Sequence, residues 1–133
     1  MIVVDTNVIA YLIINGTFTE RAKKVFAKDP NWIVPILWRY ELINILATLV
    51  NTERAELNTV IYHFESIQKI LSKFEREASF ANVLSISTQY KISAYDAQFV
   101  ALAMELDLPL ITQDKHVLKK IPNLAQSMSQ FIS

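Results

Sequence analysis

The chain has 133 residues, of which 52% are hydrophobic and 20% charged, so we expect one packed domain over residues 1–133 rather than a disordered chain. It contains no cysteine, which excludes disulfide bonds, thiolate catalysis and cysteine-bound zinc. Its 13 basic and 13 acidic residues cancel, which argues against a strong stand-alone nucleic-acid binder, because such proteins usually carry a basic surplus.

The hydrophobic pattern predicts short strands that alternate with helices. In chain order it predicts a strand at residues 2–4, helices at 6–14 and 17–28, a strand at 32–35, helices at 37–51 and 53–65, a strand at 66–72, helices at 75–90 and 95–107, a strand at 110–112, a helix at 115–121 and a last strand at 124–128. For residues 66–72 a continuing helix is the competing interpretation. No apolar run reaches the roughly 18 residues of a membrane span and no basic leader is present, so we expect a cytoplasmic protein without a membrane segment.

Alternating strands and helices are typical of an α/β fold with a parallel sheet covered by helices on both faces. Ligands of such folds bind beyond the carboxyl ends of the strands. The chain has one glycine, so a glycine-rich phosphate loop is absent, which excludes the P-loop and dinucleotide-binding proteins.

Four carboxylates stand at the ends of well-separated hydrophobic segments or inside them: Asp5, Glu41, Asp96 and Asp114. Asp5 follows a predicted strand and Asp114 follows another, so both should lie at the carboxyl edge of the sheet. If the fold brings all four acids together, a bound cation must relieve their repulsion. Hard oxygen ligands suit Mg²⁺ or Mn²⁺, which points to metal-assisted phosphoryl chemistry.

Three of these acids also have a purely structural explanation. Asp5 and Asp114 stand where a helix N-cap is expected, and Asp96 lies three residues after Ser93, as in a capping box. Taken singly, each is at least as readily a cap as a ligand. Glu41 differs, because it lies inside an apolar run where no cap is needed and an unpaired charge is costly.

Three polar residues are candidates for supporting roles. Asn44 continues a polar stripe that Glu41 begins; the stripe either faces water or lines a wet pocket at the sheet edge, and the other acids favour the pocket. Thr112 has the chemistry to hydrogen-bond a carboxylate, although a threonine at a strand end needs no function. Asn7 either acts likewise or is an ordinary residue of a first helical turn.

At these positions the chain resembles the PIN-domain nucleases. The resemblance rests on four motifs: Asp5-Thr6-Asn7, Glu41-Leu42-x-Asn44, Tyr95-Asp96-Ala97 and Leu110-Ile111-Thr112-x-Asp114. Each motif alone is weak, but the four in this order and spacing are specific and cover nearly the whole chain. In size the chain is similar to the VapC-type toxins of bacterial and archaeal toxin–antitoxin pairs.

The resemblance implies a three-layer α/β/α PIN-like domain with a central parallel sheet of four to five strands. It also implies an endoribonuclease that uses Mg²⁺ or Mn²⁺, acts on RNA, binds a protein antitoxin and forms a homodimer. The family's acidic quartet corresponds to Asp5, Glu41, Asp96 and Asp114. Its supporting polar residues correspond to Asn7 and Thr112, and Asn44 matches a position that is often polar.

Several functions compete at this point. The favoured one is the endoribonuclease toxin; the alternatives are a free-standing RNA-processing nuclease and a metal-binding interaction or regulatory module that does no chemistry. A phosphoryl-transfer enzyme with Asp5 as nucleophile is disfavoured, because the second acid two residues further on is missing.

Two predicted helices are apolar nearly all round, which predicts exposed apolar surface for a partner. The candidates for this surface are Tyr11, Ile14, Trp38 and Leu49. We expect a groove near Trp38 and Arg39 to receive an antitoxin segment, whose Arg or Lys would compete with the metal.

Overall fold

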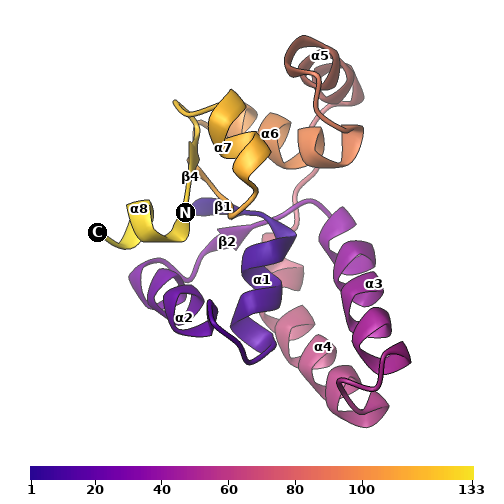
Figure 1. Cartoon of the computed structure of the whole chain (residues 1–133). Helices are drawn as coiled ribbons and strands as arrows, with labels where there is room; N and C mark the ends of the chain where they lie inside the picture. The colour runs from indigo at the N-terminus through magenta and orange to yellow at the C-terminus, as the bar shows by residue number, and fades with distance from the viewer.

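The computed structural model describes all residues 1–133 (Figure 1). The strands are β1 (Ile2–Val4), β2 (Trp32–Ile33), β3 (Leu110–Ile111) and β4 (Ala125–Gln126). The helices are α1 (Thr6–Ile13), α2 (Thr19–Lys28), α3 (Leu37–Asn51), α4 (Leu57–Leu71), the short 3₁₀ helix η1 (Ser72–Phe74), α5 (Phe80–Tyr90), α6 (Ala94–Leu106), α7 (Lys115–Lys120) and α8 (Met128–Ile132). None of the helices is long and apolar enough to span a bilayer.

The four strands form one sheet in the order β2-β1-β3-β4, and every pair is parallel. Strand β1 is central, since Val3 is paired with Ile33 on one side and with Leu110 on the other. In Figure 1, α1 to α4 lie on one side of the sheet and α5 and α6 on the other. The predicted three-layer α/β/α fold with a parallel sheet is therefore confirmed.

The core explains why the sheet edge is well defined. All three residues of β1 are buried and apolar, as expected of a strand that is covered on both faces. Helix α6 contacts β1 and β3 and is buried from Phe99 to Ala103 without interruption. A helix enclosed in this way cannot shift easily, so its first turn holds a fixed position at the end of the sheet.

The predicted strand at residues 66–72 is wrong, because these residues continue helix α4. The short alternation there is part of a longer helical pattern. Val60, Ile67 and Leu71 are buried on one face and Phe64 is half-buried beside them, at spacings of three and four residues.

The predicted strand at residues 124–128 is too long. Strand β4 spans only Ala125–Gln126, and a helix that was not predicted, α8, begins at Met128. Its start is fixed by a capping box, in which Ser127 and Gln130 each accept a hydrogen bond from the other's backbone N–H.

The prediction of a groove near Trp38 and Arg39 is also wrong. Trp38 is fully buried and stacks on Phe64 of α4, with ring centroids 5.7 Å apart. Arg39 is held by Glu75, whose two carboxylate oxygens accept hydrogen bonds of 2.7 and 2.6 Å from its guanidinium group. Helix α4 packs on α3, so the outer face of α3 is covered at this point.

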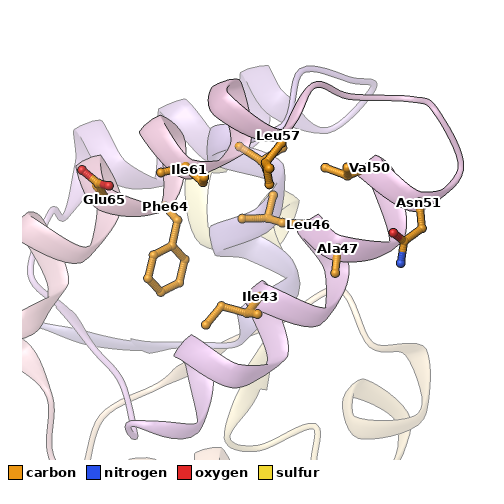
Figure 2. Close-up of a pocket in the computed structure, with 10 residues that line it drawn as sticks. Ile43, Leu46, Ala47, Val50, Asn51, Leu57, Ile61, Phe64 and Glu65 are labelled. Atoms are coloured by element: carbon orange, nitrogen blue, oxygen red, sulfur yellow. The ribbon is translucent and has the colours of Figure 1, made fainter.

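Exposed apolar surface lies further along the same two helices. Figure 2 shows Leu57, Ile61 and Phe64 of α4 pointing toward Ile43 and Leu46 of α3. Between them is an open groove whose rim residues Ile43, Leu57 and Ile61 are 48%, 59% and 44% exposed. We call it the α3–α4 groove. It is lined by Ile43, Leu46, Ala47, Val50, Asn51, Leu57, Val60, Ile61, Phe64 and Glu65.

Candidate active site

Four carboxylates from separate elements meet at the carboxyl edge of the sheet. Asp5 follows β1 directly, Asp114 immediately precedes α7, Asp96 lies in the first turn of α6, and Glu41 lies on α3. They line one open cavity of about 320 Å³, which we call the acidic cavity. Its other lining residues are Thr6, Asn7, Asn44 and Ile45. The parallel pairing of β1 with β3 brings Asp5 and the turn that carries Asp114 together here.

Thr112 lies beneath the cavity, fully buried, and connects three of its walls. Its hydroxyl donates to Asp5 Oδ2 at 2.7 Å and accepts from the backbone N–H of Asp114 at 3.0 Å. It also accepts from Asn7 Nδ2 at 3.4 Å, while Asn7 Oδ1 accepts from the Gln113 N–H at 3.3 Å. Asn7 and Thr112 therefore tie helix α1 to the turn that carries Asp114.

Glu41 has a partner that was not singled out from the sequence. The hydroxyl of Thr6, a buried residue, donates to Glu41 Oε1 at 2.6 Å. This bond holds α3 against the start of α1. The available signal was the polar residue directly after Asp5, at a point where the chain turns from strand into helix.

The capping explanation holds for two of the acids and leaves oxygen atoms free. Asp5 Oδ1 accepts from the Thr6 N–H at 2.8 Å, and Asp114 Oδ1 accepts from the N–H groups of His116 and Val117. At α6 the cap is Ser93, whose hydroxyl accepts from the Asp96 N–H. Four oxygens are left without a protein partner: both of Asp96, Oδ2 of Asp114 and Oε2 of Glu41. No unpaired polar side-chain atom is buried, so these oxygens are open to solvent.

The electrostatics of the cavity disfavour ionisation of its acids when no cation is bound. Burial is the largest cause that raises the pKa of Asp5, to about 7, and the charges of Asp96 and Glu41 add to it. The hydrogen bond from Thr112 works in the opposite direction. The Asp5 carboxyl group is therefore only partly ionised near neutral pH.

The pKa values of two other acids are raised as well. Burial raises the pKa of Glu41 and the charge of Asp96 adds to the effect, while the bond from Thr6 opposes it. Burial also raises the pKa of Asp96, with a further contribution from Asp114. Such mutual repulsion is what a cation in the cavity would relieve.

The donor set fits a hard divalent cation, although the acids do not form a ready-made cage. No three His, Asp or Glu side chains stand close enough together to enclose an ion. Mg²⁺ commonly keeps several waters and uses only one or two carboxylates together with substrate phosphates. An open cavity with four free carboxylate oxygens agrees with that mode of binding.

Comparisons with known proteins agree with this fold. A search of curated proteins finds no match. The solved structure of PAE2754 from Pyrobaculum aerophilum is similar, with a TM-score of 0.77 and 22% identity over 98% of this chain and 92% of that chain. A chain of a toxin–antitoxin complex from Klebsiella pneumoniae has a TM-score of 0.66 and 16% identity, covering 96% of this chain and 98% of its own length. The family model of the PIN domain matches residues 2–124, and the chain therefore belongs to the PIN domain family.

Proposed function

We propose that this protein is a Mg²⁺- or Mn²⁺-dependent endoribonuclease, formed by a single domain over residues 1–133, and that it is the toxin of a toxin–antitoxin pair. One observation carries the enzymatic part. Carboxylates from β1, α3, α6 and the turn after β3 line the same open cavity, and several of their oxygens are free of protein partners. PIN domains are generally metal-dependent nucleases, which agrees with this arrangement.

The proposed roles follow from which oxygens are free. Asp96, Asp114 and Glu41 would hold the cation, and Asp5, kept in place by Thr112, would complete the site. The bound ion supplies positive charge at the phosphate and lowers the pKa of a water molecule. Asn7 and Thr112 would hold the acids in position. Asn44 would lie at the rim of the acidic cavity and face the substrate.

RNA cleavage by the purified protein tests this proposal. Cleavage should require Mg²⁺ or Mn²⁺ and stop in EDTA, and Asp96→Asn should abolish it. Asp107→Asn is a matched control, because Asp107 is exposed and lies just beyond the other end of the same helix. Undiminished cleavage by Asp96→Asn at equal purity would contradict the assignment. Metal binding by the wild-type protein without any cleavage would favour the metal-binding module instead.

An antitoxin is the proposed protein partner, since the similar chain from Klebsiella pneumoniae comes from a toxin–antitoxin complex. Its site in our proposal is the α3–α4 groove, whose apolar lining suits one face of an amphipathic helix. Ile61→Ser should weaken the complex with the protein encoded by the neighbouring gene, while Glu20→Gln on α2 should not. Equal affinity of both variants would remove the groove from the proposal.

A homodimer is proposed from a second apolar surface, on α5. Phe80 and Leu84 lie one turn apart on this helix and are 86% and 62% exposed. Paired apolar side chains at such exposure are typical of an interaction site. Light scattering should give twice the chain mass for the wild type and a lower mass for Phe80→Ser. A strictly monomeric wild type would contradict this proposal.

A further inference from the structure

A second cavity, of about 560 Å³, adjoins the acidic cavity and differs from it in charge. The two share Asn7, Asn44 and Ile45 as lining residues. The second cavity lies between α1, the connection from α1 to α2, and the carboxyl-terminal half of α3. Its volume falls within the roughly 300–1,000 Å³ of cavities that bind small molecules. It is lined by Asn7, Ala10, Tyr11, Ile14, Asn15, Gly16, Thr17, Phe18, Asn44, Ile45, Thr48, Leu49 and Arg54.

Arg54 is the only charged residue of this lining, and no carboxylate neutralises it. Its guanidinium group makes one hydrogen bond, from Nε to Thr52 Oγ1 at 2.9 Å. Four of the five N–H donors of an arginine side chain are therefore free. An anion entering here meets a positive group, whereas the adjoining cavity is negative until a cation binds.

The remaining wall combines an aromatic ring with polar groups that have no protein partner. Tyr11 is half-buried, its ring lies 4.9 Å from that of Phe18, and its hydroxyl makes no hydrogen bond within the protein. The side-chain amides of Asn15 and Asn44 are likewise unpaired within the protein. An aromatic face beside free amides and an arginine is the set of groups that recognises an unstacked base and its phosphate.

We propose that this cavity binds one nucleotide of single-stranded RNA next to the phosphate that is cleaved. Its base lies against Tyr11, where Asn44 or Asn15 reads its edge, and a neighbouring phosphate is bound by Arg54. This inference rests on the proposed nuclease function and extends it from the reaction to the choice of substrate. It makes Tyr11 and Asn44 determinants of base preference and Arg54 a determinant of affinity.

Binding is measured apart from cleavage, in the Asp96→Asn background with Mg²⁺ present. The probe is a fluorescein-labelled single-stranded RNA of mixed sequence and about twelve nucleotides, long enough to fill a site of this kind. Arg54→Gln should weaken binding by roughly tenfold and reduce the slope of log K against log salt by about 0.7, the value for one phosphate contact on a single strand. Lys69→Gln is the control, since Lys69 is exposed on α4, makes no ion pair, and its replacement changes the net charge equally.

Tyr11 is tested by two substitutions. Tyr11→Leu keeps an apolar side chain but removes the aromatic face, and should weaken binding by roughly fivefold or more. Tyr11→Phe keeps the ring and should retain most of the affinity. In the otherwise wild-type enzyme, Tyr11→Leu should also alter which base is preferred beside the cleaved bond. Circular dichroism and melting curves show whether each variant is folded.

The outcomes separate this inference from the proposed function. A wild-type protein that neither cleaves nor binds RNA overturns both. A wild type that cleaves RNA, with Arg54→Gln and Tyr11→Leu binding and cleaving as the control does, overturns the nucleotide site alone. Unchanged RNA binding together with a weakened complex with a protein partner also overturns it, and assigns the cavity to a protein segment.

Discussion

Replacing Asp5 with Asn should stabilise the metal-free protein near neutral pH, even though Asp5 belongs to the proposed catalytic site. In the folded protein the pKa of Asp5 is raised from 3.8 to about 7. The folded state therefore keeps a proton that the unfolded chain has already lost. The contribution of Asp5 to the free energy of unfolding is fully present below its unfolded pKa. It falls as the pH rises from about 4 to about 7 and stays low above that.

The size of the effect follows from the shift in pKa. The shift is about 3 pH units and each unit corresponds to about 1.4 kcal/mol, so ionisation of Asp5 costs about 4 kcal/mol near pH 8. Asn can still accept from the Thr6 N–H, but its amide gives the Thr112 hydroxyl no acceptor, which costs about 1 kcal/mol. We expect a net gain in the free energy of unfolding of about 3 kcal/mol near pH 8. Near pH 4 we expect no gain, because the cost of ionising Asp5 is then small and the loss of the hydrogen bond cancels it.

Urea unfolding in EDTA, followed by circular dichroism near pH 4 and near pH 8, measures this difference. Glu65→Gln serves as the control, because Glu65 is exposed on α4 and makes no hydrogen bond or ion pair. It should leave the free energy of unfolding nearly unchanged at both pH values. A variant Asp5→Asn that is less stable than the wild type near pH 8 would show that the carboxylate acts as a favourable cap and not as a repelled charge.

Three further predictions concern two hydrogen-bonded side chains and the binding of metal. Thr112→Val removes the hydroxyl that Asp5 and its neighbours share, and should lower the free energy of unfolding by about 2–3 kcal/mol and reduce cleavage, whereas Thr112→Ser should keep most of both. Glu75→Gln weakens the partner of Arg39 and Trp38 and should cost about 1–3 kcal/mol in urea unfolding. Because the pKa of several acids is raised, Mg²⁺ binding should release protons and tighten between about pH 5 and 8, which calorimetry in buffers of different ionisation enthalpy detects.

The composition of the acidic cavity could be predicted because it depends on simple geometry. Asp5 and Asp114 follow strands that are parallel, and carboxyl ends of parallel strands share one edge of a sheet. Glu41 stood out because a charge inside an apolar helix needs a partner. The bond from Thr6 to Glu41 could not be predicted, since it depends on how closely α3 approaches α1.

Two of the wrong predictions involve helix α4. Trp38 was expected at the surface because a single sheet cannot cover both sides of an apolar helix, but α4 covers the second side and Phe64 stacks on Trp38. Helix α4 also continues through the predicted strand at residues 66–72. The short alternation there fits a strand when it is taken alone, but together with Val60 and Phe64 it has helical spacing. Helix α8 had a readable signal in Ser127 and Gln130, a capping pair in a segment assigned to a strand.

The central position of β1 has a consequence for the order in which the acidic cavity assembles as the chain folds. Strand β1 pairs with β3, which lies far along the chain at residues 110–111, so this pairing is a long-range contact that forms slowly. Asp5 gains the Thr112 bond, and the cavity gains Asp114, only when these two strands are paired. A chain that ended between Asp96 and β3 would carry Asp5, Glu41 and Asp96 without the sheet edge that joins them. A copy in which these strands have not yet paired would therefore lack the complete site of the proposed nuclease.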